Sequence, residues 1–101
     1  MTTYNKLVRD KIPNILDKKG VSYEKRIATD AEYKTELIIK LQEEAKEFAE
    51  DCSIEELADV LEVVEALKKL PEYLAVENVR IKKVDERGAF NERIILKGEK
   101  A

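Results

Sequence analysis

The stretch formed by residues 37–67 constrains the fold most, because it has the pattern of two amphipathic helices separated by a tight break at residues 50–53. On both sides of the break, apolar residues recur at the spacing of one helix face. At about 100° per residue, acidic residues fall at the edge of that face or about 60° beyond it. Each helix carries one such pair, at the same edge of its apolar face: Glu44 with Glu47, and Glu56 with Asp59.

The two acidic pairs also match in height along the predicted hairpin. If the turn lies at Cys52, a rise of 1.5 Å per residue places Glu47 and Glu56 roughly 6–8 Å from it, and Glu44 and Asp59 roughly 10–12 Å from it. Four carboxylates that converge beside an apolar seam repel one another and lose hydration, so they require a cation or raised pKa values. A hard, oxygen-seeking cation suits such a cluster, and Mg²⁺, with Mn²⁺ as its substitute, is the ion we expect.

Two alternatives remain open for these acids. The chain is 41% charged, and an acidic pair at a helix edge is in general a solvated surface. Glu56 also follows Ser53 at capping-box spacing, so its carboxylate could turn back to the Ser53 amide. The match in edge and height favours a metal site, and we predict four ligands for it: Glu44, Glu47, Glu56 and Asp59.

The whole chain is expected to form one domain, residues 1–101, with an all-α bundle of about four helices. An irregular lead-in over residues 1–8 should precede a short helix from about Arg9 to Lys19, ended by Gly20. Thr29 or Asp30 should cap the second helix and Ser53 the third. Pro71 should open a fourth helix that stops near Gly88. Residues 21–28 and the tail around Ile94 could add a small two-stranded ribbon.

Composition narrows the classes of function. A net charge of −3 gives no reason to expect a nucleic-acid partner, and no apolar run reaches membrane-spanning length. The N-terminus lacks the apolar core of a secretory signal, and the single cysteine, Cys52, cannot form an internal disulfide. These features predict a cytoplasmic protein. The absence of histidine removes both His-based catalysis and the usual zinc sites.

A carboxylate site without histidine suits the hydrolysis of phosphate esters or anhydrides, because Mg²⁺ takes phosphate and water as its other ligands. Glu43 and Glu47 are both candidates for the carboxylate that accepts a proton from water. A polyphosphate also needs cations near the metal. Basic residues near the two ends of the chain are candidates for this role, each with a plain surface cation as the alternative: Lys6, Arg9, Lys11, Lys82, Lys83, Arg87 and Arg93. Phe90 could pack on a base or in the core.

Four stretches together resemble the MazG-like, all-α nucleotide pyrophosphohydrolase superfamily. They are EEAKE with ELAD (residues 43–47 and 56–59), NKLVRDKIP (5–13), ELADVLEV (56–63) and ERGAFNERI (86–94). The resemblance spans nearly the whole chain and is closest to small single-domain proteins similar to phosphoribosyl-ATP pyrophosphohydrolase. It implies Mg²⁺-dependent cleavage of nucleoside triphosphates between the α and β phosphates, homodimers or homotetramers, and metal ligands at Glu44, Glu47, Glu56 and Asp59. The spacer between Glu47 and Glu56 is shorter than is usual in the family.

Three functions follow as hypotheses. The first is a house-cleaning hydrolase that converts canonical or damaged (d)NTPs to monophosphates and pyrophosphate. The second is hydrolysis of phosphoribosyl-ATP in histidine biosynthesis, because the acidic motifs are shared. The third is a non-catalytic helical oligomerisation module that retains the acids without using them. Substrate competition separates the first two, and a Glu44→Gln variant that loses activity while folded excludes the third.

Overall fold

The structure is a computed structural model in which residues 5–99 are described. Its elements are α1 (Ile12–Lys18), α2 (Asp30–Asp51), α3 (Ile54–Lys68), the short 3₁₀ helix η1 (Pro71–Tyr73) and α4 (Val76–Arg87). Residues 5–99 contain no β-strand, so the predicted all-α class is confirmed and the two-stranded ribbon does not form within that range. The lead-in is irregular over residues 5–8, and residues 1–4 lie outside the described part.

The hairpin of α2 and α3 begins and reverses direction at the residues that the sequence predicted as helix caps. Thr29 Oγ1 accepts a hydrogen bond from the Glu32 amide at 3.3 Å, which satisfies one of the free N–H groups at the start of α2. Cys52 then adopts the left-handed conformation with φ 55°, a helix-ending geometry that reverses the chain within two residues. Ser53 Oγ accepts from the Glu56 amide at 3.2 Å and starts α3.

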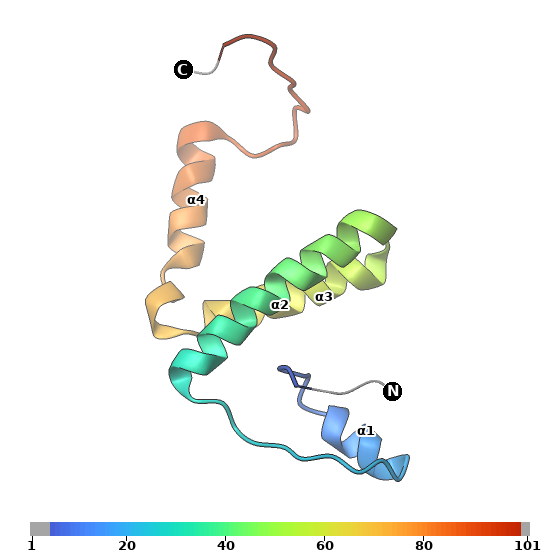
Figure 1. Cartoon of the computed structure of the whole chain (residues 1–101). Coiled ribbons are helices and arrows are strands. Elements are labelled where there is room, and N and C mark those ends of the chain that lie inside the picture. The colour runs from blue at the N-terminus through green and yellow to red at the C-terminus, as the bar shows by residue number, and fades with distance from the viewer. Residues whose placement is uncertain (1–4, 100–101) are drawn as a thin grey trace.

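The two long helices lie side by side and antiparallel, and they form the centre of the molecule (Figure 1). Leu37 of α2 and Val63 of α3 are the buried apolar side chains among the described residues, with 3% and 6% of their surface exposed. Most of the other large apolar side chains are partly or largely exposed. A single chain therefore has only a small hydrophobic core.

The N-terminal segment, residues 5–29, runs beneath the hairpin in the view of Figure 1. Its helix α1 is shorter than the predicted span, because Pro13 is confined to the first turn and the chain before Ile12 is not helical. Residues 21–28 are irregular instead of a strand, and Arg26 ties their end to α2 through an ion pair with Glu32.

The predicted fourth helix is interrupted near its start. Pro71 opens the short 3₁₀ turn η1, in which the Tyr73 amide bonds to the Leu70 carbonyl at 2.9 Å, and α4 begins only at Val76. Proline fits the first turn of either helix type, so its position could not distinguish a tight 3₁₀ turn from a continuous α-helix. Gly88 ends α4 as expected, with φ 82°.

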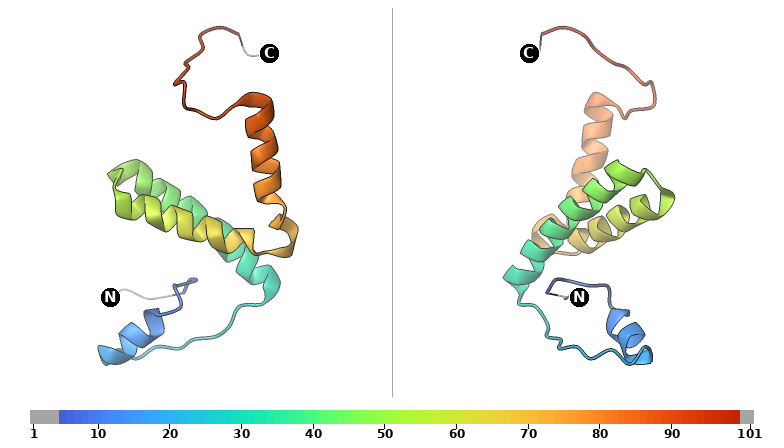
Figure 2. Two further views of the ribbon diagram at one scale, coloured as in Figure 1. Left: turned by 180° about the vertical axis from the view of Figure 1, so that it is seen from behind. Right: turned by 45° about the vertical axis from the view of Figure 1, so that its right-hand side comes forward.

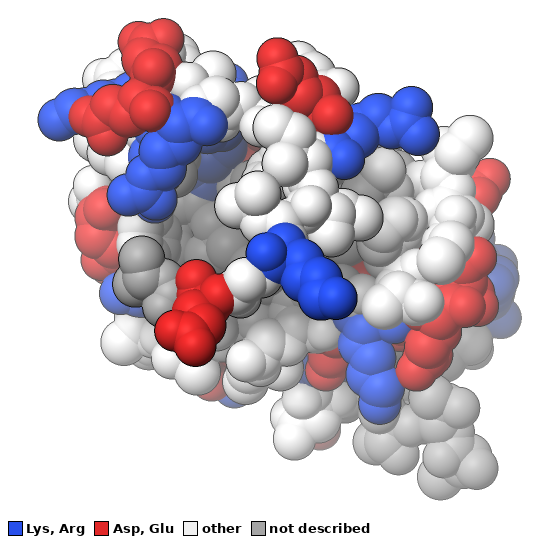
Figure 3. Space-filling view, turned by 90° about the horizontal axis from the view of Figure 1, so that it is seen from above, with Lys and Arg blue, Asp and Glu red and all other residues white. Residues whose placement is uncertain are grey.

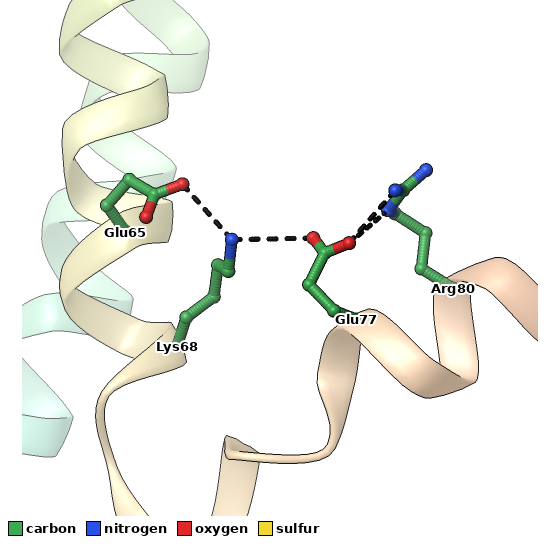
Figure 4. Close-up of polar contacts among 4 residues, drawn as sticks. All are labelled: Glu65, Lys68, Glu77 and Arg80. Carbon is green, nitrogen blue, oxygen red and sulfur yellow. Dashed lines mark hydrogen bonds and ion pairs between the residues drawn. The ribbon is translucent and has the colours of Figure 1, made fainter.

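A chain of ion pairs joins α4 to the end of α3 (Figure 4). Lys68 Nζ lies 3.2 Å from Glu65 and 3.4 Å from Glu77, and Glu77 in turn lies 2.9 Å from Arg80. The side chains are between 28% and 62% exposed, and exposed ion pairs contribute about 0–1 kcal/mol each. α4 thus takes its direction from polar contacts rather than from a shared core.

The molecule is extended for its size. The Cα radius of gyration is 18.1 Å, whereas a compact chain of this length would have roughly 13 Å. Both views in Figure 2 show α4 and the C-terminal tail standing clear of the hairpin. Within residues 5–99, no helix combines the length and apolar character that a membrane span requires.

Candidate metal centre

Three carboxylates from both helices of the hairpin meet at one point. Glu44 of α2 and Glu56 and Asp59 of α3 each offer an oxygen, and these oxygens lie within 4.8 Å of one another. All three residues are half-buried. The hairpin is what assembles them, because the turn at Cys52 sets the two acidic edges side by side and the Ser53 cap fixes the backbone at Glu56.

Two oxygens of this cluster are buried without a hydrogen-bond partner: Oε2 of Glu44 and Oε2 of Glu56. A buried carboxylate oxygen that lacks a donor costs free energy, since it has given up its hydration. The capping-box alternative for Glu56 is not adopted: no hydrogen bond joins its carboxylate to the Ser53 amide, whereas the Glu56 amide does donate to Ser53. The acids of the cluster therefore offer unused ligand atoms.

The electrostatics of the cluster agree with this crowding. The pKa of Glu44 is raised above its ordinary value of 4.5, first by burial and then by the charges of Glu47 and Asp59, while Lys40 opposes the shift. The pKa of Glu56 is raised for the same reasons, with burial the largest cause, followed by Glu47. Both shifts mean that burial first and like charge second disfavour the ionised cluster, and a bound cation would offset both effects.

Cations flank the cluster on the side of the N-terminal segment. Arg9 donates from Nη2 to Asp59 Oδ1 at 2.7 Å, and Lys40 Nζ lies 3.8 Å from Glu44 Oε1. An open groove of about 190 Å³ runs past them, lined by Lys6, Val8, Arg9, Ile12, Lys40, Glu44 and Asp59. The groove thus brings two of the carboxylates together with three positive side chains, a combination that suits a metal-bound polyphosphate.

Glu47 and Glu43, the other two acids predicted to act here, lie differently. Glu47 is exposed and is not one of the three residues whose oxygens meet, although it is close enough to raise the pKa of both Glu44 and Glu56. Glu43 is exposed and lines a separate small hollow with Lys6 and Lys40. Of the two, Glu47 is the one that acts electrostatically on the cluster.

The predicted phosphate-binding cations divide into two groups. Lys6 and Arg9 line the groove, and Lys11 is exposed on the same segment without lining it. Lys82, Lys83, Arg87 and Arg93 are exposed on α4 and the tail, which stand away from the cluster within one chain. Phe90 lies in the same tail and is 96% exposed. Lys, Arg, Asp and Glu side chains are interspersed on the face seen from above in Figure 3.

Lys40 is the functional candidate that the sequence interpretation missed. It precedes Glu44 by four residues on the same helix, the spacing at which side chains on one face meet. That spacing was visible in the sequence, and it was the only signal. No spacing in the sequence indicates that Arg9 pairs with Asp59, because fifty residues separate them.

The donor set fits a hard divalent cation. Three carboxylates from two helices match the oxygen ligands of Mg²⁺ or Mn²⁺, and the open groove leaves room for water and phosphate. No family model, curated protein or solved structure shows a significant match to this chain. The cluster, the groove and the sequence motifs are therefore the features that indicate a function.

Proposed function

We propose that this protein is a Mg²⁺-dependent nucleotide pyrophosphohydrolase, which cleaves a nucleoside or deoxynucleoside triphosphate between the α and β phosphates. The products are a nucleoside monophosphate and pyrophosphate, and the role is the removal of surplus or damaged nucleotides. The observation that carries the proposal is the meeting of Glu44, Glu56 and Asp59 within 4.8 Å, with two buried carboxylate oxygens lacking a partner.

In this proposal Glu44, Glu56 and Asp59 hold the cation, which when bound supplies positive charge to the phosphate oxygens and acidifies water. Glu47 accepts a proton from the attacking water, because it lies at the rim of the cluster and remains exposed. Glu43 is the second candidate for that proton, and its position in a separate hollow makes it the weaker one.

The three cations that line the groove, Lys6, Arg9 and Lys40, bind the triphosphate. Arg9 offers a planar fork of donors to phosphate oxygens, and Lys6 and Lys40 add point charges. Arg9 bonds to Asp59 in this structure, so binding phosphate would require it to exchange that carboxylate for a phosphate oxygen. The exchange places a cation on the substrate and leaves Asp59 available as a metal ligand.

The test is pyrophosphate release from a panel of (d)NTPs and phosphoribosyl-ATP, measured with Mg²⁺ and again with EDTA. We expect Mg²⁺-dependent release of pyrophosphate, rather than orthophosphate, from one or more (d)NTPs. Release from phosphoribosyl-ATP alone would place the protein in histidine biosynthesis instead. No release from any of them by folded protein would leave the non-catalytic module, which the exposed apolar side chains of α3 and α4 would favour.

A further inference from the structure

One side of the groove beside the acidic cluster is formed by a segment that is not part of the hairpin. Four of the groove residues belong to residues 5–19, which we call the strap: Lys6, Val8, Arg9 and Ile12. The other three belong to the hairpin: Lys40, Glu44 and Asp59. The groove therefore exists only while the strap lies against α2 and α3, as it does in this structure (Figure 1).

Few contacts hold the strap in this position. No residue of α1 is buried, and Ile15 keeps 44% of its surface exposed. Within the described residues 5–99, one polar side-chain contact joins the strap to the hairpin: Arg9 Nη2 lies 2.7 Å from Asp59 Oδ1. These side chains are 55% and 40% exposed, and an exposed ion pair favours the closed position only about two- to fivefold.

The connection from α1 to α2 contains a point at which it can bend. This connection is irregular and mostly exposed. The Tyr23 hydroxyl donates to Asp17 Oδ1 at 2.7 Å, which fastens the start of the connection to α1. Arg26 forms an ion pair with Glu32, which fastens its end to α2. Residues 24–25 lie between these two contacts and are both exposed, so they are the hinge about which the strap would turn.

The strap is positively charged where it meets the cluster. Residues 5–12 contain three basic side chains and one acid: Lys6, Arg9, Lys11 and Asp10. When Asp59 ligates a divalent cation, Arg9 loses its partner and the strap faces a like charge instead of an acid. A polyphosphate in the groove reverses the sign again and attracts the same side chains, with Arg9 as its forked donor.

We propose that the strap is a gate that responds to the charge in the groove. It is closed on the free carboxylates, it is released when Glu44, Glu56 and Asp59 hold a divalent cation, and it closes again over a polyphosphate bound beside that cation. The groove is thus open while the substrate enters and enclosed once phosphate is in place. A cation alone does not keep the gate closed, so closure reports that a phosphate ligand is present.

The inference rests on the cation site of the proposed function, but it does not depend on cleavage. If the chain binds a cation and the strap stays in place, the gate is wrong and the cation site stands. If the strap moves as proposed and no nucleotide is cleaved, the gate stands and the proposed hydrolysis is wrong. A folded chain that binds no divalent cation would overturn both.

The first test measures the distance between the strap and the hairpin with two nitroxide labels. One label is attached to Cys52, the single cysteine, which is exposed, and the other to a cysteine introduced in α1 by Asn14→Cys. Asn14 is also exposed. Double electron–electron resonance is recorded in EDTA with NaCl at matched ionic strength, then in Mg²⁺. A third sample contains imidodiphosphate, a pyrophosphate analogue that resists hydrolysis, with Mg²⁺ in excess so that the analogue does not strip the site.

We expect a narrow distance as the major population in EDTA and a shift to longer, broader distances in Mg²⁺. The narrow distance should return with imidodiphosphate. An unchanged distribution in Mg²⁺, under conditions in which Mg²⁺ displaces bound Mn²⁺ from the chain, would overturn the gate. So would a shift in Mg²⁺ that imidodiphosphate leaves unreversed.

Two variants of the doubly labelled chain test whether the pair of Arg9 and Asp59 closes the gate. Arg9→Gln and Lys19→Gln each remove one positive charge from the strap, and Lys19 is exposed and does not line the groove. In EDTA, we expect Arg9→Gln to raise the ratio of open to closed populations about two- to fivefold. Lys19→Gln should pass through the three states as the unaltered chain does. An Arg9→Gln distribution equal to that of Lys19→Gln in EDTA would contradict the proposal.

Hydrogen exchange in the unlabelled wild-type chain provides a second readout. A seven-residue helix is too short to be stable alone, so the amides of α1 should exchange faster when the strap leaves the hairpin. We expect Mg²⁺ to accelerate exchange in α1 about two- to fivefold and to slow it in α3, which the bound cation stabilises. Imidodiphosphate with excess Mg²⁺ should slow α1 again. Exchange that slows in α1 and α3 together on addition of Mg²⁺ would show that the strap stays closed.

Discussion

Glu44 occupies the point at which burial, like charge and an unsatisfied oxygen coincide. Replacing it with glutamine keeps the shape and removes one charge from the cluster. We expect the metal-free variant to be more stable by about 0.5 kcal/mol, since one like-charge repulsion is relieved. That difference corresponds to a rise of roughly 2–4 °C in Tm. We also expect the Mg²⁺-dependent rise in Tm, and the Mg²⁺-dependent release of pyrophosphate, to be lost.

Glu62→Gln is the matched control for this experiment. Glu62 lies on α3 and is exposed, so the same loss of charge occurs outside the cluster. The control should retain both the response to Mg²⁺ and the activity. If Glu44→Gln kept its response to Mg²⁺, the cluster would not be the metal site.

Arg9 competes with a cation for Asp59, because its guanidinium already bonds to that carboxylate at 2.7 Å. Arg9→Gln should therefore tighten metal binding about two- to fivefold, which matches the 0.5–1 kcal/mol of an exposed ion pair. It should at the same time raise the KM for nucleotide, since the phosphate loses a cation. Arg26→Gln breaks a comparable ion pair with Glu32, far along α2 from the cluster, and should change neither quantity. Unchanged metal affinity in Arg9→Gln would contradict this competition.

The pH dependence of stability follows from the raised pKa values of Glu44 and Glu56, which burial causes first and neighbouring acids second. A carboxyl with a raised pKa binds its proton more tightly in the folded state than in the unfolded chain. Its contribution to stability is complete below the unfolded value of 4.5 and is lost as the pH rises through the folded pKa. Without metal, the protein should gain stability as the pH falls from neutrality toward 4.5.

Two other acids limit how far the pH can fall before the protein loses stability again. Hydrogen bonds from Arg26 and Arg80 lower the pKa of Glu32 and Glu77, so their contribution is lost as the pH falls below 4.5. Urea midpoints measured in EDTA should therefore reach a maximum on the acidic side of neutrality. The rise toward it should be shallower in Glu44→Gln. A midpoint that falls steadily from neutrality would show that the cluster is not strained.

At the scale of the element, the start of α3 links folding to the site. Ser53→Ala removes the hydroxyl that accepts from the Glu56 amide, and loss of such a cap costs about 1 kcal/mol. Because Glu56 lies in that first turn, we expect weaker binding of Mg²⁺ as well as a lower Tm. Thr29→Ala removes the equivalent cap of α2 at similar cost, but Thr29 lies fifteen residues before Glu44.

Comparison of these two cap variants distinguishes a local effect from a general loss of stability. Both should lower Tm to a similar extent, and only Ser53→Ala should lower the affinity for Mg²⁺. Equal losses of affinity in the two variants would mean that the cluster responds to stability alone.

The helices were predictable where a local rule decides their ends. Thr29, Ser53 and Gly88 act within one turn of the helix that they cap or end, so the sequence reveals them. The break after Pro71 and the irregular course of residues 21–28 were not predictable, because alternation and proline position suit more than one local structure. Apolar residues of the tail, such as Ile94 and Ile95, would be expected in a core, but the sequence does not show what they would pack against, and in this structure they are exposed.

The site was predictable as far as helix geometry extends. Glu44 and Asp59 have similar heights on two adjacent helices, and Glu56 lies about one turn nearer the break; these positions follow from sequence spacing. Spacing also placed Glu47 opposite Glu56, but Glu47 is not among the three residues whose oxygens meet. The salt bridge between Arg9 and Asp59 depends on how the N-terminal segment crosses the hairpin, which spacing does not determine. Lys83 and Arg87 belong to α4, which stands away from the hairpin, and sequence spacing does not determine that separation.

At the scale of the whole molecule, stability should depend on concentration if the exposed apolar side chains of α3 and α4 associate with a second copy. Association that favours the folded state raises the Tm as protein concentration increases. We expect this rise in the wild-type chain, with its exposed apolar side chains. A Tm that is the same at low and high concentration of wild type would contradict a dimer that contributes to folding.

A titration with Mn²⁺ followed by electron paramagnetic resonance measures whether Glu44, Glu56 and Asp59 bind a divalent cation. Free Mn²⁺ gives a sharp six-line signal that is lost on binding, and Mn²⁺ takes the same oxygen ligands as Mg²⁺. We predict that wild type and Glu62→Gln reduce the free signal, that added Mg²⁺ restores it, and that Glu44→Gln leaves it near the level of buffer. An equal reduction by Glu44→Gln would show that the cation does not bind at the three carboxylates.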